Sequence, residues 1–338
     1  MMPLDRNESY WMLDDELVKA VAAPGACELS TYPDYGELKE ALATYAGVAP
    51  ENILPTSGSV AAIEHVARAY ASGGVILPVP TFYYYETILE RMKAKVLPLA
   101  YEERDGAFVF PLEETIAALK SNTAKVLFLC HPNNPLGCAL TSEEISAIVA
   151  AARESDTTIV SDEAYYEFSS GASFLPYLAE LPNLIIIRTL SKALALSGAR
   201  VGYLIAAPKR LKEIENVMLP WTVTYPSVAA ALALLARADK VKVRREAVLS
   251  ARDHFIGALS AISGVTVYPS ETNFVLIRLP NAAHVRDALL EKGIRVALGE
   301  PMSHFEAAGT LLRDTLRIAI PAPESEVSFL QALTKTLR

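Results

Sequence analysis

The sequence predicts an α/β protein with a large, mainly parallel, doubly wound sheet and a smaller α/β domain at the C-terminal end. Two observations lead to this prediction. Short apolar, β-branched runs alternate with segments of helical periodicity over residues 75–206, which is typical of a parallel sheet covered by helices on both faces. After about residue 236 this alternation ends, and a long polar helix precedes a short group of strands and helices. The length of 338 residues corresponds to about two domains.

Each element of the larger domain is expected where the apolar residues follow one period. Helical spacing covers 37–46 and 60–71, and glycines follow both segments as stop signals. The strands expected in the sheet lie at 75–79, 95–98, 124–130, 157–161, 184–188 and 201–206. The helices expected between them lie at 86–93, 112–120, 142–154 and 209–218.

The smaller domain is expected to begin with a long helix at 240–261. The strands expected after it lie at 265–268, 273–279, 294–298 and 316–320. Two further helices are expected at 282–292 and from residue 324 onwards, and a short one near the N-terminus at 14–22.

Composition excludes several classes of protein. The net charge of −8 and the pI near 5.3 argue against nucleic acid or an anionic membrane as a partner. No apolar run reaches the roughly 18 residues of a membrane span, and residues 1–6 contain no apolar signal region. The three cysteines are odd in number and the histidines are scattered, so neither a disulfide framework nor a metal site is expected. We expect a reduced, cytoplasmic enzyme.

A lysine follows the apolar run 184–188 and is therefore expected at the carboxyl end of a buried strand, where ligands bind in open α/β sheets. Burying a charged Lys192 is costly, so its amine is a candidate for a lowered pKa and for Schiff-base chemistry. Arg200 adds a second cation, and Thr189 and Ser191 add hydroxyls. This combination suits an aldehyde cofactor that carries a phosphate.

Polar and aromatic residues also follow other expected strands. Ser57-Gly58-Ser59 opens the helix 60–71, where free backbone N–H groups form an anion site, although an ordinary N-cap at Ser59 is the alternative. Phe82 follows the strand 75–79 and can stack on a planar ring, whereas most of residues 83–85 are expected as core aromatics.

Two charged residues complete the candidate site. Asp162 follows the strand 157–161, and a carboxylate facing a pyridine nitrogen keeps it protonated, although a turn or cap role is the alternative. Arg317 stands at the start of the strand expected at 316–320, and its guanidinium can bind a carboxylate bidentately. The alternative is that Arg317 is a surface residue.

The whole stretch from Thr189-Leu-Ser-Lys192 to Ser197-Gly-Ala-Arg200-Val-Gly-Tyr203 resembles the cofactor-lysine segment of pyridoxal-phosphate (PLP) aminotransferases of the aspartate aminotransferase type. The closest resemblance is to histidinol-phosphate aminotransferases, and it extends from Leu4 to the C-terminus. It implies the PLP-dependent transferase fold type I, with a large PLP-binding domain at 30–236. It also implies that residues 1–29 join 237–338 in the small domain.

The resemblance assigns roles towards the cofactor pyridoxal 5′-phosphate. Lys192 would be the Schiff-base lysine and proton shuttle, Asp162 the partner of the pyridinium nitrogen, and Phe82 the residue stacked on the ring. Asn134, in an Asn-Pro-x-Gly turn, and Tyr165, in Asp-Glu-Ala-Tyr, would hydrogen-bond the phenolic oxygen. The groups expected around the phosphate are Ser57, Gly58, Ser59, Thr189, Ser191 and Arg200.

The resemblance also assigns the substrate side of the site. Arg317 would bind the substrate α-carboxylate, and Asn7, in Leu-Asp-x-Asn-Glu, would line the substrate pocket. Tyr32 sits where the family supplies a tyrosine from the neighbouring subunit to the phosphate. A homodimer with shared active sites is therefore expected.

The sequence departs from the histidinol-phosphate pattern at several positions. Ala297 stands where an arginine usually helps to hold the substrate phosphate, and Ile320-Pro-Ala replaces Ile-Gly-Thr. Leu136 replaces the usual threonine of the Asn-Pro turn. Trp221 and Tyr225, expected near the pocket, would suit an aromatic or apolar substrate side chain instead.

The expected activity is the transfer of an amino group between an L-amino acid, or an amino-alcohol phosphate, and a 2-oxo acid by a ping-pong mechanism. The alternative within the fold is a decarboxylase resembling threonine-phosphate decarboxylase. A transcription regulator with an aminotransferase-like effector domain is disfavoured by the acidic pI and by the few residues ahead of Tyr32. A metal-dependent enzyme is disfavoured because ligand spacing is lacking.

Overall fold

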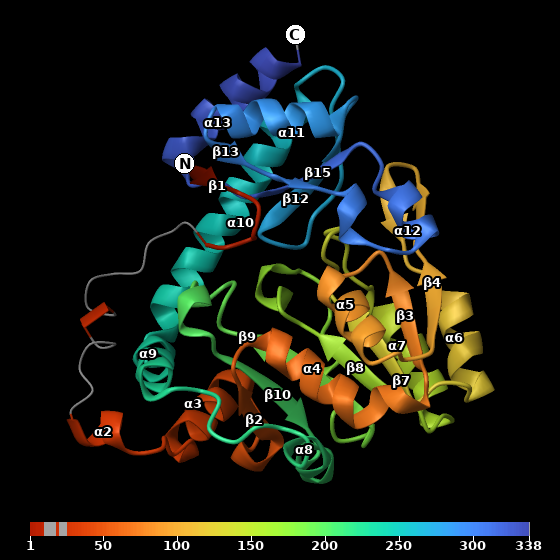
Figure 1. The fold of residues 1–338 in the computed structure, drawn as a ribbon, viewed down its shortest axis with the longest axis vertical. Coiled ribbons are helices and arrows are strands. Elements are labelled where there is room, and N and C mark those ends of the chain that lie inside the picture. The colour runs from red at the N-terminus through yellow and green to blue at the C-terminus, as the bar shows by residue number, and fades with distance from the viewer. Residues whose placement is uncertain (10–17, 20–25, 338) are drawn as a thin grey trace.

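The computed structural model describes residues 1–9, 18–19 and 26–337 (Figure 1). Most of the helix expected at 14–22 lies outside these residues. In Figure 1 a large sheet forms the lower part of the molecule and a smaller sheet the upper part. The long helix α10 (Ala238–Ser260) rises between the two parts.

The large sheet has seven strands in the order β2-β10-β9-β8-β7-β3-β4. Their bounds are β2 Ile53–Thr56, β3 Val75–Val79, β4 Val96–Ala100, β7 Val126–Cys130, β8 Thr158–Asp162, β9 Leu184–Thr189 and β10 Gly202–Ala206. The five strands from β9 to β4 pair in parallel, whereas β10 is antiparallel to both of its neighbours. The prediction of a mainly parallel sheet is confirmed.

Helices cover both faces of this sheet because the strands are apolar on both faces. In β9, Leu184 and Ile186 pack into one buried cluster, while Ile185 and Ile187 pack into another on the opposite face. The helices of this part are α3 Gly36–Ala46, α4 Ser59–Tyr70, α5 Tyr83–Arg91, α6 Leu112–Ser121, α7 Ser142–Arg153, α8 Pro208–Glu215 and α9 Tyr225–Leu235. This two-sided cover is the doubly wound arrangement.

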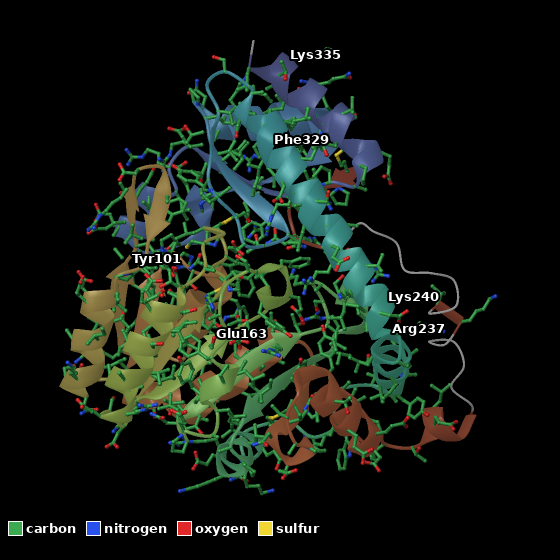
Figure 2. The ribbon with its side chains drawn as sticks, turned by 180° about the vertical axis from the view of Figure 1, so that it is seen from behind. Tyr101, Glu163, Arg237, Lys240, Phe329 and Lys335 are labelled. Atoms are coloured by element: carbon green, nitrogen blue, oxygen red, sulfur yellow. The ribbon has the colours of Figure 1, made fainter. Side chains whose placement is uncertain are left out.

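The smaller sheet is antiparallel, in the order β11-β12-β15-β14. Its strands are β11 Thr266–Val267, β12 Phe274–Arg278, β14 Ala297–Leu298 and β15 Thr315–Ala319. The helices beside it are α11 Ala282–Glu291, α12 Glu306–Leu311 and α13 Pro323–Thr336. Figure 2 shows α10 from behind, rising from Arg237 and Lys240 towards Phe329 of α13, whose ring meets Phe255 of α10 edge-on.

The N-terminal strand joins the C-terminal part of the chain. β1 (Met2–Pro3) pairs in parallel with β13 (Ile294–Arg295). The single strand expected at 294–298 is thus two strands, because β13 pairs with β1 and β14 with β15. We propose on this basis that residues 1–9 join 237–338 in the small domain and that 30–236 form the large one; of the expected small-domain segment 1–29, residues 10–17 and 20–25 lie outside the described part of the chain.

Some elements escaped sequence reasoning. The hairpin of β5 (Glu102–Arg104) and β6 (Ala107–Val109) is short, and β5 is entirely exposed. A polar, exposed strand has no apolar alternation to reveal it. The short helices α2 (Ala26–Ser30) and α12 were not expected either.

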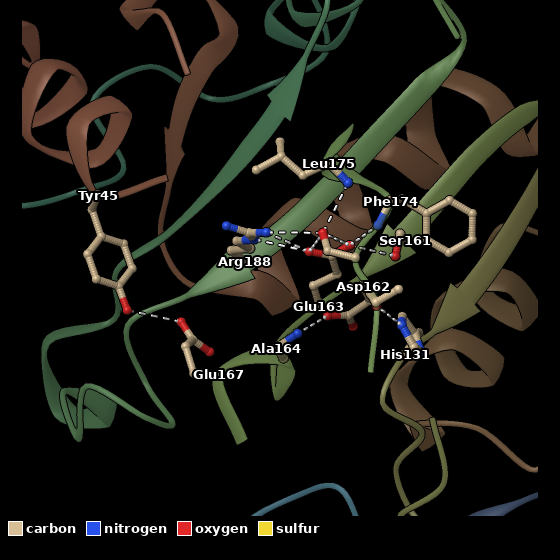
Figure 3. A network of polar contacts seen from close by, with 12 residues as sticks. Tyr45, His131, Ser161, Asp162, Glu163, Ala164, Glu167, Phe174, Leu175 and Arg188 are labelled. Atoms are coloured by element: carbon tan, nitrogen blue, oxygen red, sulfur yellow. Dashed lines mark hydrogen bonds and ion pairs between the residues drawn. The ribbon is translucent and has the colours of Figure 1, made fainter. Parts of the chain in front are cut away.

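A buried ion pair lies beside the carboxyl end of β8 (Figure 3). The Glu163 carboxylate accepts hydrogen bonds from Arg188 at 2.9 and 3.1 Å, from Ser173 Oγ at 2.9 Å and from Phe174 N at 3.0 Å. The side chains of Glu163 and Arg188 are 0% and 2% exposed. The Arg188 guanidinium also lies 3.7 Å from the Tyr166 ring centroid.

Replacing Glu163 by glutamine is expected to lower the free energy of unfolding by about 3–5 kcal/mol, because Arg188 would keep a buried charge without its ionic partner. The measurement is equilibrium urea denaturation at fixed protein concentration. Glu102→Gln is the matched control, since Glu102 pairs with Arg104 on the surface and such pairs contribute less than about 1 kcal/mol. Equal losses in the two variants would contradict the prediction.

Candidate active site

A cavity of about 550 Å³ lies where the carboxyl ends of β7, β8 and β9 meet the N-terminal segment and β15. This volume is in the range of small-molecule sites. Ten of the residues predicted from the sequence line it, namely Asn7, Ser59, Phe82, Asn134, Asp162, Tyr165, Ser191, Lys192, Arg200 and Arg317. The structure therefore brings together side chains from both ends of the chain.

Lys192 follows β9 and points its amine at the N-terminal segment. Its Nζ donates hydrogen bonds to the carbonyl oxygens of Arg6 at 3.1 Å and Asn7 at 3.2 Å. Burial lowers the pKa of Lys192 to about 8, and the positive charge of Arg317 acts in the same direction. A substantial share of the amine is therefore uncharged and nucleophilic near pH 8.

An anion site lies at the N-terminus of α4. Gly58 has a φ of +86°, and a Cβ there would stand 2.4 Å from the Arg200 guanidinium, so only glycine allows this approach. Arg200 Nη1 donates to Ser191 Oγ at 3.3 Å, and Thr189 Oγ1 lies 3.0 Å from that same oxygen. Backbone N–H groups at the helix start, hydroxyls and a guanidinium fit a phosphate.

Gly202 brings β10 against this loop. A Cβ at Gly202 would lie 2.7 Å from the Gly58 carbonyl carbon and from Ser59 N. Ser57, Gly58 and Thr189 thus stand behind the residues that line the cavity, within the same loop or strand end. Their place around a phosphate stays a prediction.

Asp162 ends β8 at the floor of the cavity and is fully buried. Its Oδ1 accepts from Ala164 N at 3.2 Å, and its Oδ2 accepts from the Tyr85 hydroxyl at 2.9 Å (Figure 3 shows the first). Burial raises the pKa of Asp162 to about 6, against the opposing effect of the Tyr85 hydrogen bond. A cationic ring nitrogen would stabilise the ionised form.

A chain of polar contacts links the N-terminal segment to β15. The Tyr165 hydroxyl accepts from Asn7 Nδ2 at 3.0 Å and from Asn134 Nδ2 at 3.4 Å. Arg317 donates to Asn134 Oδ1 and, at 2.6 Å, to the carbonyl oxygen of Asp5. The four predicted residues Asn7, Asn134, Tyr165 and Arg317 therefore form one network. Asn273, which sequence reasoning missed, donates to the Asn7 carbonyl oxygen at 3.1 Å.

Leu136 leaves the turn that carries Asn134 intact. Leu136 N donates to Asn133 Oδ1 at 3.0 Å, and Gly137 N donates to Asn133 O at 2.9 Å. The Leu136 side chain is fully buried in the apolar core. Packing by leucine at this position does not displace the turn.

Some expected residues lie elsewhere. Within the part of the chain that the structure describes, neither Trp221 nor Tyr225 lines the cavity, and the expectation that Trp221 stands near the pocket is wrong for a single protomer. Trp221 lines a separate surface pocket between α3 and α8. Its ring stacks on Tyr32 at a centroid distance of 4.3 Å, and Tyr32 is 75% exposed. Trp221 lies in the loop after α8, and Tyr225 is the first residue of α9.

The cavity also contains residues that sequence reasoning missed. These are Asp5, Arg6, Glu8, Val60, Tyr83, Cys130, Ala164 and Ser197. Tyr83 belongs to the group 83–85, most of which was expected in the core, but it is 54% exposed and lines the cavity, because it starts α5 on the side facing the solvent. A usable signal existed for Cys130, which ends β7 directly beside Asp162 of β8.

The fold and the site together define a PLP-dependent enzyme of fold type I, with pyridoxal 5′-phosphate as its cofactor. The chain belongs to the aminotransferase class I and II family, whose model matches residues 1–330.

Relatives and solved structures agree with this assignment. The histidinol-phosphate aminotransferase of Thermoanaerobacter pseudethanolicus is 34% identical, over 99% of this chain and 92% of the relative. The crystal structure of histidinol-phosphate aminotransferase from Sinorhizobium meliloti with pyridoxal-5′-phosphate is 26% identical, with a TM-score of 0.86 over 100% of this chain and 91% of that one. L-threonine-O-3-phosphate decarboxylase from Porphyromonas gingivalis is 25% identical, with a TM-score of 0.85 over 100% and 99% of the two chains.

In the described residues no helix is long and apolar enough to cross a membrane.

Proposed function

We propose that this protein transfers an amino group between an L-amino acid, or an amino-alcohol phosphate, and a 2-oxo acid by a ping-pong mechanism. The observation that carries the proposal is the convergence of Lys192, Asp162 and Arg317 on one cavity. These groups supply a nucleophilic amine, a buried anion and a carboxylate-binding cation, which are the parts that such a transfer needs.

The residues present fit the cofactor. Lys192 Nζ would hold it covalently, and Arg200, Ser191 and the start of α4 would hold its phosphate. Phe82, which lines the cavity and precedes α5, would pack on the ring face. When bound, the cofactor supplies an electron sink for the negative charge that develops at the substrate Cα.

The chain's own residues then carry the remaining steps. Arg317 orients the substrate carboxylate, which fixes the direction of the bond to be broken. Lys192 Nζ takes the proton from Cα and later returns one, and its lowered pKa suits both directions near pH 8. Tyr165 and Asn134, which are hydrogen-bonded to each other, would hold the phenolic oxygen of the cofactor.

The substrate side chain proposed is aromatic or apolar. Ala297 of β14 is the cross-strand neighbour of Arg317, so an arginine at this position would stand beside the substrate-binding residue. Alanine removes that cation, while Val60, Phe82 and Tyr83 line the cavity. A substrate without a phosphate fits this composition better than histidinol phosphate.

Steady-state kinetics with phenylalanine, tyrosine and histidinol phosphate as amino donors tests this proposal. We expect kcat/KM for an aromatic amino acid to exceed that for histidinol phosphate by at least about tenfold, since even one methylene-sized contact in an apolar pocket contributes about 1–3 kcal/mol. Glutamate and alanine serve as comparison donors. A strong preference for histidinol phosphate would show that the missing arginine is replaced by another group.

The second candidate is a decarboxylase acting on a phosphorylated amino acid, supported by the likeness to L-threonine-O-3-phosphate decarboxylase. The same amine and the same buried anion would serve it, but the bond to the carboxylate breaks instead of the bond to hydrogen. Product analysis separates the two candidates. Release of CO2 without transfer of the amino group to 2-oxoglutarate would favour the decarboxylase.

We further propose a homodimer in which Tyr32 reaches the phosphate site of the neighbouring subunit. The exposed position of Tyr32, on the same side of α3 as the Trp221 pocket, supports a role outside its own cavity.

A further inference from the structure

We propose that Tyr85 is a positioning residue, which holds Asp162 ionised and directed at the ring nitrogen of the cofactor. The inference rests on the proposed function, because it assigns a second residue to the task proposed for Asp162. Sequence reasoning had placed Tyr85 among the core aromatics, and its ring does pack there.

The packing of the Tyr85 ring directs its hydroxyl towards Asp162. The side chain is fully buried, with its ring centroid 5.0 Å from that of Phe128 and edge-on to Phe82 at 6.5 Å. The hydroxyl ends 2.9 Å from Asp162 Oδ2. Packing on two rings fixes the tyrosine, and the tyrosine in turn fixes one oxygen of the carboxylate.

The start of α5 thus carries one residue proposed to contact the face of the cofactor ring and one proposed to act, through Asp162, at its nitrogen. Phe82 is the residue before the helix, and Tyr85 stands in its first turn. Their backbones are joined by the hydrogen bond from Tyr85 N to Phe82 O at 3.0 Å. The proposed stacking residue and the proposed positioning residue are therefore joined within one helix start.

The charged groups around Asp162 determine how much the hydrogen bond from Tyr85 affects the protonation of this carboxylate. The charged groups that act on the carboxylate are Glu163, which raises its pKa, and Lys192, which lowers it. The side chain of Glu163 is bound to Arg188 rather than to the cavity, and the neighbouring Cys130 thiol has its pKa raised by burial, so it stays neutral. Burial also raises the pKa of Tyr85, so its hydroxyl stays protonated and can only donate to Asp162.

A donated hydrogen bond favours the charged form of a carboxylate. Without it, the proton shared between Asp162 and a pyridine nitrogen shifts towards the carboxylate. The nitrogen then loses its positive charge, and the ring accepts electrons less readily. Loss of the hydroxyl should therefore slow the chemistry and leave substrate binding nearly unchanged.

The test compares Tyr85→Phe with Tyr84→Phe. Tyr84 is the matched control, because it lies on the same helix and its hydroxyl binds Glu64 Oε2 at 3.0 Å, away from the cavity. Both holoenzymes are loaded with PLP labelled with ¹⁵N at the ring nitrogen. The ¹⁵N chemical shift reports directly whether this nitrogen is protonated.

For Tyr85→Phe we expect the ¹⁵N signal to move towards the unprotonated position and kcat to fall roughly tenfold, which corresponds to about 1.4 kcal/mol. KM for the amino acid should change less than about threefold. Tyr84→Phe should match the wild type in all three measurements. A signal and a kcat equal to those of the wild type in Tyr85→Phe would overturn the inference.

Tyr85→Phe could also lower kcat by disturbing the packing of the core. A double-mutant cycle with Asp162 separates this effect from loss of the hydrogen bond. In an Asp162→Asn background, removal of the Tyr85 hydroxyl should have little further effect on kcat. An undiminished second loss would mean that Tyr85 acts only through packing and would overturn the inference. Failure of the wild type to bind PLP would instead overturn the proposed function, so the two failures are distinguishable.

Discussion

Replacing Lys192 with alanine is expected to reduce transamination by about 10⁴-fold or more. The reason is that one amine serves both as the covalent holder of the cofactor and as the acid and base at Cα, and general acid–base catalysis alone contributes up to about 10⁴-fold. The variant should also lack the visible absorption band of a lysine-bound cofactor after incubation with PLP. Both effects are read from an absorbance spectrum and a coupled assay.

Lys209→Ala is the matched control for this experiment. Lys209 lies exposed in the first turn of α8, after the antiparallel strand β10, and it is not among the residues that line the cavity. This control should remain yellow and active. A Lys192→Ala protein that was as yellow and as active as the wild type would remove the basis of the whole functional proposal.

Replacing Asp162 with asparagine is expected to lower kcat by about 10²–10³-fold, the range for loss of one preorganised charged group at a reacting centre. Asparagine keeps the size of the side chain, and its one amide oxygen can still accept from Ala164 N, while its NH2 group can donate to the Tyr85 hydroxyl oxygen. It cannot supply the negative charge that keeps a pyridine nitrogen protonated. The KM for the amino acid should change little, because Asp162 acts on the ring and Arg317 holds the substrate.

Asp156→Asn controls for the loss of an aspartate close in sequence. Asp156 is exposed just before β8, and its backbone N–H donates to Asn122. We expect its kcat to equal that of the wild type. If Asp162→Asn kept full kcat, the buried carboxylate would be structural, and the electron-sink role would have to lie with another group.

The local pattern of apolar residues was sufficient to predict most strands of the large sheet. The run Val75–Val79 was predicted to the residue, and β7, β8 and β9 differ from prediction by at most two residues at each end. These strands are buried on both faces, so burial alone makes their sequences continuous and apolar. The prediction of a single strand at 294–298 was wrong, because its two halves pair with different strands. The pairing partners of a strand cannot be read from a run of five residues.

The candidate site also has residues that the sequence could predict and residues that it could not. Motifs that are contiguous in the chain, around Lys192, Asp162 and Asn134, were predicted correctly as lining one cavity. Tyr85 looked like any core aromatic, because its role depends on one hydroxyl meeting a carboxylate from another strand. Trp221 was placed wrongly, because the course of the loop after α8 depends on packing rather than on a motif.

The sequence by itself determined that a lysine, an aspartate and an anion-binding glycine loop stand at the ends of buried strands, since period and polarity are properties of neighbouring residues. Only the tertiary structure decided that the carbonyl oxygens of Arg6 and Asn7 reach the Lys192 amine, and that Arg317 reaches Asn134. Those contacts join segments separated by most of the chain. The contacts of Lys192 with Arg6 and Asn7 exist because β1 pairs with β13 and thereby draws the N-terminus across the cavity.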